Sequence, residues 1–367
     1  METPRGGKSY DLIVAGAGPA GSTCAITAAR AGARVLLLDK DRFPRHKVCG
    51  EFVSPESLRL LESLLSHTRF QLQPEVDSAR IFLDGKSIAF PLAPAARSIP
   101  RFDLDAALLE SARSSGVQVE EGTIVHEVHE VKENGGFTVR AAEGKTFTAR
   151  AVVNTTGRWS QLTQFESAAK EKWLGLKAHF TESSPPSSVD LYFFSGGYCG
   201  VTPVDGQSIN ACAMVQAGVA RSLPEVFAAH PELWRRSRNW QPLFPAVTTS
   251  PLYFRKPETS NRGMILAGDS AGFIDPFAGD GISLALQSGA LAATTLRYFF
   301  DARCSLPECQ EMYRAAYLKR LAPAFRNAAR LRWLLSTPAW LRSLLIGFVG
   351  TRPVARMIVS RTRARTS

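Results

Sequence analysis

The sequence DLIVAGAGPAGSTCAITAARAGARVLLLD, residues 11–39, decides the fold of this chain. It begins with a short apolar run and continues through three glycines into a stretch of small residues. After Gly32 it returns to a second apolar run that ends at Asp39. Short apolar runs of this kind are typical of buried strands, and glycine suits the C-terminus of the intervening helix. The segment therefore predicts a strand, a glycine turn, a helix and a second strand, the opening unit of a dinucleotide-binding α/β fold.

The spacing of the three glycines suits the approach of a pyrophosphate. Gly16 makes the tight turn, Gly18 lets the backbone come close to the phosphates, and Gly21 lets the helix pack closely. Asp39, 18 residues after Gly21, stands where a carboxylate accepts the hydroxyl groups of an adenosine ribose. An ordinary tight turn is the alternative interpretation. Both strands, the helix and the acid occur in the order and at the spacing of a dinucleotide-binding unit, which favours dinucleotide binding.

Length and charge exclude several classes of protein. The chain has 367 residues, 45% hydrophobic and 21% charged, so it is long enough to bury a sizeable core and to form more than one domain. Of the net charge of +11, residues 301–367 hold 13 Lys and Arg against 3 Asp and Glu, which leaves 31 against 30 for residues 1–300. The basic residues are not interleaved with aromatic residues in a recognisable module, so we expect no nucleic-acid partner.

Cysteine usage and hydropathy indicate the compartment. The six cysteines lie far apart without a C-x-x-C pair, which favours a reducing environment, and the scattered histidines predict no metal site. The first ten residues are short and polar, and no stretch approaches the ~20 apolar residues that span a bilayer. We therefore expect a cytoplasmic protein.

Further motifs lie in three other parts of the chain. Residues 264–267 (MILA) predict a buried strand, which is followed by GDSAG at 268–272 and DPFAGDGI at 275–282. FPRHKVCGE occupies residues 43–51, and RFDLD occupies residues 101–105. With the opening unit, these segments resemble the FAD-dependent oxidoreductases of the para-hydroxybenzoate hydroxylase superfold and, within it, the geranylgeranyl reductase family. The resemblance covers most of residues 10–160 and 260–300.

The resemblance implies that the following residues bind FAD: Gly16, Gly18, Pro19, Ala20, Gly21, Asp39, Lys40, Cys49, Gly50, Arg101, Val125, Asp269, Gly281 and Ile282. It assigns Asp269 to the ribityl chain, and the helix that begins at Gly281 would direct its positive end at the flavin. Cys49 is either a thiol that donates a proton over the flavin or a small residue in a tight loop. For Glu51 and Asp280, solvated loop carboxylates are the expectation.

The predicted fold is mixed α+β / α/β. A Rossmann-type FAD-binding domain (residues 1–70, 97–165 and 259–300) is interleaved with a substrate domain built on an antiparallel sheet (residues 71–96 and 166–258). The expected strands of that sheet are a hairpin over 79–90 and runs at 174–180, 189–194, 198–204 and 208–215. If Asp205 and Gly206 form a two-residue turn, Cys199 lies directly opposite Cys212 as a pair of packed thiols.

Residues 301–367 predict basic amphipathic helices. They contain single arginines between apolar clusters, a pattern that suits contact with the surface of a membrane. The other interpretation is a set of helices that cover the substrate cavity.

The resemblance also implies an activity, namely that of a FAD-dependent oxidoreductase acting on a hydrophobic small molecule. The specific form is reduction of an isoprenoid-like carbon–carbon double bond by hydride from reduced FAD. The alternative is a monooxygenase that hydroxylates an aromatic or lipid-like compound, and a protein in which FAD is only structural is a third interpretation. A halogenase is disfavoured because the Trp-x-Trp element is missing. No second glycine fingerprint occurs between residues 100 and 260, so NAD(P)H, free reduced flavin or a small electron carrier would bind transiently.

Overall fold

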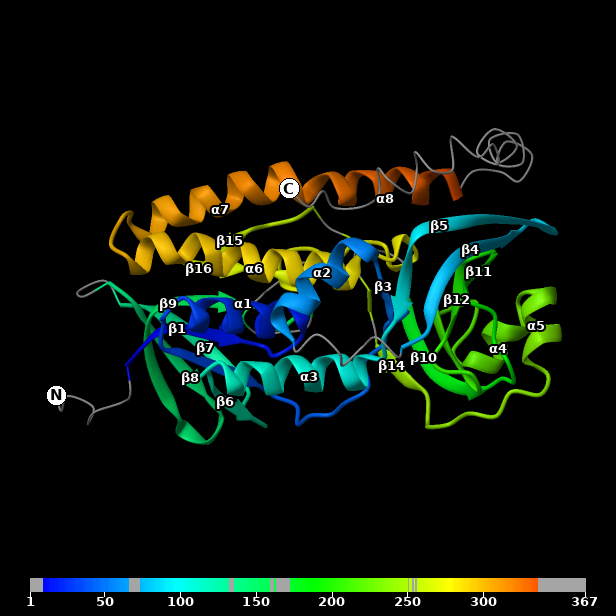
Figure 1. Cartoon of the computed structure of the whole chain (residues 1–367), viewed down its shortest axis with the longest axis horizontal. Coiled ribbons are helices and arrows are strands. Elements are labelled where there is room, and N and C mark those ends of the chain that lie inside the picture. The colour runs from blue at the N-terminus through cyan, green and yellow to red at the C-terminus, as the bar shows by residue number, and fades with distance from the viewer. Residues whose placement is uncertain are drawn as a thin grey trace.

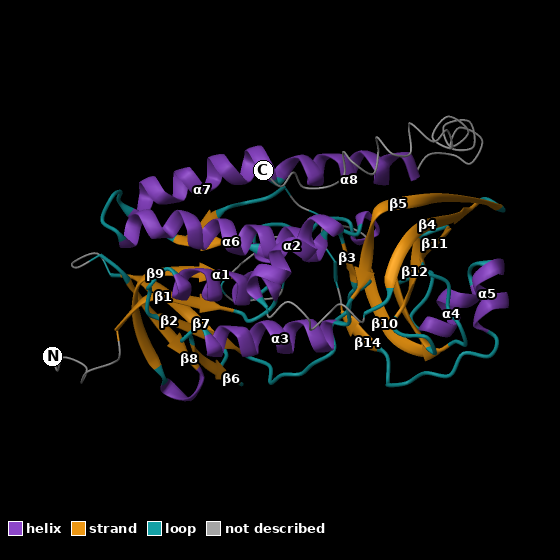
Figure 2. Ribbon diagram, viewed as in Figure 1, coloured by secondary structure: helices purple, strands orange, loops and turns teal. Residues whose placement is uncertain are grey.

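Two sheets lie at opposite ends of the long axis of the molecule, and helices run along them (Figure 1). The computed structural model describes residues 9–65, 73–131, 135–158, 162, 172–249, 251–252, 254 and 256–335. Figure 2 shows the short helices α4 (Leu223–Ala228) and α5 (Pro231–Ser237) beside the second sheet and longer helices along the first.

The first sheet contains the opening unit, as predicted. β1 (Ser9–Ala15), α1 (Pro19–Arg30) and β2 (Val35–Asp39) follow one another, and β1 pairs in parallel with both β2 and β9 (Thr146–Asn154). The strand order is β15-β16-β9-β1-β2-β6, where β6 is Gln118–Glu121, β15 is Ser260–Asn261 and β16 is Met264–Leu266. β8 (Phe137–Ala141) also pairs with β9, and β7 (Val125–Glu130) pairs with β8. The chain order reverses between β1 and β9, which is where ligands bind in sheets of this kind.

Helices cover the first sheet, and segments that are far apart in the sequence pack against each other there. α3 (Arg101–Ser114) and α6 (Gly281–Phe300) pack with α1, and α2 (Pro55–Leu64) lies against α6. α1 and α6 approach so closely that a Cβ on Gly289 would lie 2.1 Å from the carbonyl oxygen of Ala20. On the outside of α6 lies α7 (Leu306–Arg320), from which the Tyr313 hydroxyl donates to the Leu266 carbonyl at 2.9 Å.

The second sheet contains every strand predicted for the substrate domain. Its order is β14-β10-β13-β12-β11-β4-β5-β3, made of β3 (Phe52–Val53), β4 (Glu75–Leu83), β5 (Lys86–Ser98), β10 (Trp173–Thr181), β11 (Ser188–Phe194), β12 (Gly197–Pro203), β13 (Ser208–Gln216) and β14 (Val247–Thr249). The expectation of a purely antiparallel sheet is wrong at one place, because β11 pairs in parallel with β4. These two strands lie far apart in the sequence, so no short turn fixes their relative direction.

The predicted pairing of Cys199 with Cys212 is also wrong. Cys199 lies opposite Ala213, and Cys212 lies opposite Gly200. The turn is longer than two residues, since the Val204 N–H donates to the Ser208 carbonyl at 2.9 Å. A shift of one residue turns a side chain to the other face of a sheet. Cys199 therefore packs in the core beneath α4 (Leu223–Ala228) and α5 (Pro231–Ser237), and both thiols are free.

The described residues after 301 form two helices. α7 is followed directly by α8 (Ala322–Leu335), and the remainder of the predicted basic helices lies outside the described residues. In the part of the chain that the structure describes, no helix is both long enough and apolar enough to cross a membrane. Contact with a membrane surface stays a prediction.

Candidate functional site

A cavity of about 1180 Å³ lies between the two sheets. Its walls are the turn after β1, the loop after β2, the start of α3, the start of α6 and the inner face of the second sheet. Pockets for a single small ligand commonly measure about 300–1,000 Å³. The cavity therefore has room for a cofactor and a substrate together.

The structure brings almost all of the predicted site residues to this cavity. Those that line it are Gly16, Gly18, Pro19, Ala20, Asp39, Lys40, Cys49, Gly50, Arg101, Val125, Asp269, Gly281 and Ile282. Gly21 is not among the lining residues but lies behind the turn, where a Cβ would be 1.7 Å from the Gly16 carbonyl oxygen. Its place matches the packing role predicted from the glycine spacing.

The glycine turn is shaped for a bound anion. Gly16 has a φ of +105°, and a Cβ there would lie 2.4 Å from the Thr155 carbonyl oxygen. Gly18 is the N-cap of α1 and provides no side chain to cap it, so the first N–H groups of the helix are available to a ligand. Asp39 accepts hydrogen bonds from Ala17 N at 2.6 Å and Asp41 N at 2.8 Å, which fix its carboxylate at the end of β2.

A fixed cation stands beside the turn. The Arg101 guanidinium donates to both carboxylate oxygens of Asp105, each at 2.7 Å, and Asp105 is fully buried. Burial acts to lower the pKa of Arg101, but Asp105 and Cys49 raise it above the usual value, so the side chain stays charged. Its Nη2 atom lies 3.8 Å from the place of a Cβ on Gly18. A pyrophosphate at the turn would therefore meet a cation as well as helix N–H groups.

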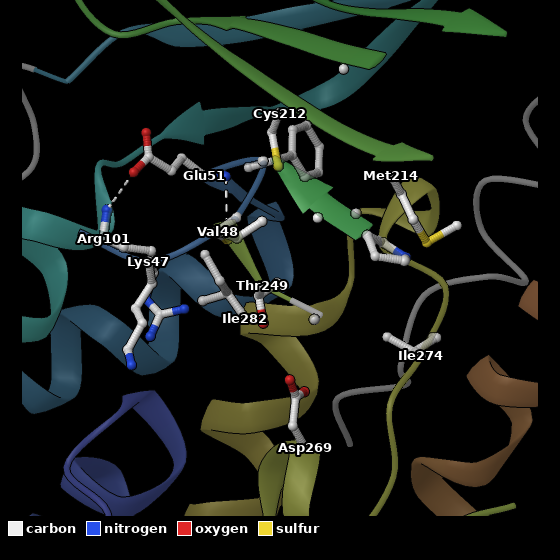
Figure 3. Close-up of a pocket in the computed structure, with 18 of the residues that line it drawn as sticks. Lys47, Val48, Glu51, Arg101, Cys212, Met214, Thr249, Asp269, Ile274 and Ile282 are labelled. Carbon is white, nitrogen blue, oxygen red and sulfur yellow. Dashed lines mark hydrogen bonds between the residues drawn. The ribbon is translucent and has the colours of Figure 1, made fainter. Parts of the chain in front are cut away.

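The second half of the predicted cofactor site follows β16. Asp269 lies in the short helical turn Gly268–Ser270, and its side chain is 36% exposed, with Arg158 Nε 3.7 Å from its carboxylate. Figure 3 shows Asp269 on the side of the cavity opposite to Cys212 and Met214. α6 begins at Gly281 without a side-chain cap from Asp280. The residues present thus offer FAD an anion cradle, two carboxylates for hydroxyl groups and a helix N-terminus.

The burial of two carboxylates, one of them in the loop that carries Cys49, differs from the expectation. Glu51 and Asp280 are not solvated, since they are 0% and 2% exposed. The Glu51 carboxylate accepts from Arg101 N at 2.8 Å, contacts Lys177 Nζ and accepts from His179 Nε2 at 2.7 Å (Figure 3 shows the first of these bonds). These partners on β10 were missed from the sequence. The signal available for them was two polar residues, two apart and so on one face, in an otherwise apolar strand.

The second sheet supplies an apolar wall. Alternate residues of β4, β5 and β11 face the cavity: Ala79, Ile81, Leu83, Ile88, Phe90, Leu92, Val189, Leu191 and Phe193. Ile81 lies opposite Ile88 on one side and opposite Leu191 on the other, so the side chains form a continuous surface. At about 3.3 Å per residue, the wall extends roughly 13 Å along β4. The cavity therefore has a polar end at the first sheet and an apolar end at the second.

A buried acid before α6 forms an ion pair with the C-terminal helix α8. Asp275, just before α6, is 2% exposed and accepts from Arg332 of α8 at 2.6 Å. Burial raises the pKa of Asp275 to about 7, although the Arg332 guanidinium acts in the opposite direction. Its Oδ1 atom is buried without a hydrogen-bond partner among the described residues.

Comparisons with known proteins agree with this geometry. The family model described as "FAD binding domain" matches residues 9–226. The menaquinone reductase of Mycobacterium tuberculosis (strain ATCC 25618 / H37Rv) is 25% identical over 366 residues, covering 91% of this chain and 86% of that protein. The digeranylgeranylglycerophospholipid reductase of Methanocella arvoryzae is 28% identical over 317 residues, covering 78% and 77%.

Solved structures show the same fold. A geranylgeranyl bacteriochlorophyll reductase-like protein from Thermoplasma acidophilum superposes with a TM-score of 0.81 at 22% identity, over 97% of this chain and 96% of that one. A flavin-dependent brominase also gives a TM-score of 0.81, at 20% identity, over 97% and 93%. The same architecture thus occurs in proteins named for reduction and for halogenation, and the site must decide between chemistries.

Proposed function

The chain belongs to the FAD-binding domain family and is a FAD-dependent enzyme, and from this premise we propose that it reduces an isoprenoid-like carbon–carbon double bond in a hydrophobic substrate. When bound, FAD supplies the redox chemistry, because its reduced form can deliver a hydride. Reduction of the double bond consumes that hydride at one carbon and a proton at the other. The residues of this chain bind the cofactor, place the substrate and supply or conduct the proton.

In this proposal the polar end of the cavity holds the cofactor. The backbone at Gly16 and Gly18, with Arg101, binds the pyrophosphate, and Asp39 binds the adenosine ribose. Asp269 accepts from the ribityl hydroxyl groups. The N-terminus of α6 at Gly281 stabilises negative charge on the flavin ring. Cys49, which lines the cavity, is the candidate proton donor, and a bound water is the alternative.

One observation carries the choice of substrate, namely that the apolar wall opens into the same cavity as the glycine turn. A wall of branched and aromatic side chains about 13 Å long gains free energy by burying a hydrocarbon chain and offers little to a small polar substrate. Ile81, Ile88 and Leu191 are only half-buried in the absence of a ligand, so a bound chain would cover them further. This surface supports a long apolar substrate.

The relatives support the same class. Two of them are named as reductases of menaquinone and of digeranylgeranylglycerophospholipids. Both names denote lipids that carry isoprenoid chains. Halogenases are also among the relatives, at similar identity, so the family alone does not choose between the two reactions, and the apolar wall is what favours the reductase.

The test uses the FAD-loaded protein, photoreduced without oxygen and mixed with single candidate substrates. The panel contains a geranylgeranyl ether lipid, a menaquinone with an unsaturated side chain and, as control, the fully saturated form of the ether lipid. We expect the flavin to reoxidise without oxygen in the presence of an unsaturated lipid, and that lipid to gain two hydrogen atoms in its isoprenoid chain. Fragment mass spectrometry locates them after any quinol has been returned to the quinone in air. The saturated control should leave the flavin reduced.

A second arm admits oxygen to the photoreduced protein. Slow reoxidation by oxygen agrees with a reductase. Fast reoxidation that requires oxygen and adds one oxygen atom to a compound, with no anaerobic reaction on any lipid of the panel, would overturn the proposal in favour of a monooxygenase.

A further inference from the structure

A buried ion cluster connects the second sheet to the loop that carries Cys49. It consists of Glu51, Lys177 and His179. Lys177 Nζ contacts Glu51 Oε1, and His179 Nε2 lies 2.7 Å from Glu51 Oε2. The side chains of Glu51 and Lys177 are 0% exposed and that of His179 is 9% exposed. None of the roles assigned above to the cofactor or the substrate uses these three side chains.

The same sheet also holds the backbone of the loop. Asn210 Nδ2 donates to the Cys49 carbonyl and the Thr202 hydroxyl donates to the Gly50 carbonyl, both at 3.1 Å. The Ile99 N–H donates to the Glu51 carbonyl at 2.8 Å. β10, β12 and β13 therefore hold three consecutive loop residues through four side chains.

Glu51 has a strained backbone. Its φ of +59° is in the left-handed region, which costs free energy for a residue with a side chain. Such a conformation persists where the surroundings determine it strongly, and it occurs preferentially at functional sites. Here the surroundings are the cluster and the hydrogen bonds to the loop.

The Glu51 carboxylate also lies at the start of α3. Pro100 is the N-cap of this helix and provides no side-chain cap, and Glu51 Oε1 accepts from Arg101 N at 2.8 Å. Burial acts to raise the pKa of Glu51, but the hydrogen bond from His179 and the charge of Lys177 hold it below the usual value, so Glu51 is ionised. One carboxylate thus fixes the loop after Cys49 and the first residue of α3.

Stability alone is a poor explanation for this arrangement. A buried ion pair often contributes no more free energy than well-packed apolar side chains of the same size, because both charges lose their hydration. Its gain is a unique geometry. The two groups that Glu51 fixes, Cys49 and Arg101, both line the cavity, and the Cys49 thiol accepts from Glu51 N at 3.4 Å.

We propose that Glu51, held by Lys177 and His179, is a positioning residue that sets where Cys49 and Arg101 stand against the cofactor. The placement of the cofactor-side loop is thereby determined by the substrate-side sheet. This inference depends on FAD binding but not on the identity of the substrate, so it can be tested even if the proposed lipid is wrong.

The test measures how fast Cys49 in the FAD-loaded protein reacts with iodoacetamide, read from the peptide that contains it by mass spectrometry. The variants are Glu51→Gln and Lys177→Met, which each remove one charge of the cluster. We expect both to release the loop and to change the alkylation rate of Cys49 at least tenfold. The FAD affinity should fall as well, because Arg101 loses its fixed place beside the glycine turn.

Glu182→Gln is the matched control. Glu182, directly after β10, forms an ion pair with Arg236 of α5, with Nε to Oε1 at 2.8 Å, and its side-chain partners in the described part of the chain do not include the loop. We expect it to lower the melting temperature without changing the reactivity of Cys49. An equal change in the control would mean that loosening the sheet is sufficient, and would overturn the proposal.

A pair of variants at His179 keeps the test decisive if loss of a charge prevents folding. His179→Gln retains an N–H donor of similar reach and should keep the rate of the unaltered protein. His179→Ala removes the donor and should change the rate in the same direction as Lys177→Met. A rate within twofold of the unaltered protein in folded, FAD-loaded His179→Ala or Lys177→Met would reject the positioning role.

Discussion

The two ends of the cavity are built in different ways. At the first sheet the binding surface is mainly backbone, made by a glycine with a φ of +105°, the N-termini of helices and a carboxylate fixed by N–H groups. At the second sheet it is made of side chains that alternate along strands brought together from distant parts of the chain. Few substitutions are compatible with the end that is made mainly of backbone. Substitutions at the end made of side chains can change the binding surface without altering the fold. The comparison explains how one architecture serves relatives with different substrates.

The substitution with the largest expected effect disrupts the end of the cavity that is made mainly of backbone. In Gly16→Ala the new Cβ would stand 2.4 Å from the Thr155 carbonyl oxygen, so the turn must move away from the pyrophosphate position. We expect the protein to lose its FAD on gel filtration, measured as flavin absorbance per protein, and all turnover with it.

Gly32→Ala is the matched control, because Gly32 also has a positive φ, +94°, but has open space around the position of a Cβ. It should cost some stability and keep its FAD. If Gly16→Ala retains as much flavin as this control, the turn does not bind the pyrophosphate.

The substitution with the next largest expected effect disrupts the end of the cavity made of side chains and leaves the cofactor end intact. Ile88→Glu places a carboxylate on the apolar wall, where an apolar chain would leave it without hydration. We expect kcat/KM for the best lipid of the panel to fall about 100-fold, equivalent to ~2.7 kcal/mol, with unchanged FAD content. Ala89→Glu is the control, since Ala89 is the next residue on β5 and is exposed. Equal losses in both variants would remove the wall from substrate binding.

The last prediction concerns stability rather than binding, at the buried acid Asp275 before α6. The folded-state pKa of Asp275, about 7, lies above the value near 3.9 of an unfolded chain. The folded protein therefore binds more protons than the unfolded one between these values, and its stability falls as pH rises through this window. The contribution is at most ~4 kcal/mol. In Asp275→Asn this pH dependence of stability should disappear. The melting temperatures of the variant and the unaltered protein should therefore converge or cross between pH 4 and 7. Parallel curves would contradict it.

The same contrast decides what the sequence could reveal. The opening unit follows from a local motif, because a glycine turn and the strand before it are encoded within a few residues. FAD and the thirteen lining residues follow from the family resemblance that this motif and the others carry together. The partners of Glu51 do not, since Lys177 and His179 lie more than a hundred residues away in the sequence, on β10. The same holds for the parallel pairing of β11 with β4 and for the one-residue shift that separates Cys199 from Cys212. Register depends on the whole sheet and on the length of a turn, which a pattern of alternation does not determine.

The position of β16 in the first sheet has a consequence for synthesis on the ribosome. β16 pairs with β9, and the second sheet is encoded largely between Asn154 and Met264, which end β9 and begin β16. At about 5–20 residues per second, translation of that interval takes on the order of 5–20 s. Throughout it, the edge of β9 lacks its neighbour, and an unpaired edge is a template for association with other chains. The nascent chain therefore exposes Val153 and Asn154 of β9 until β16, the last strand among the described residues, has emerged, and we expect chaperones to bind it during this interval.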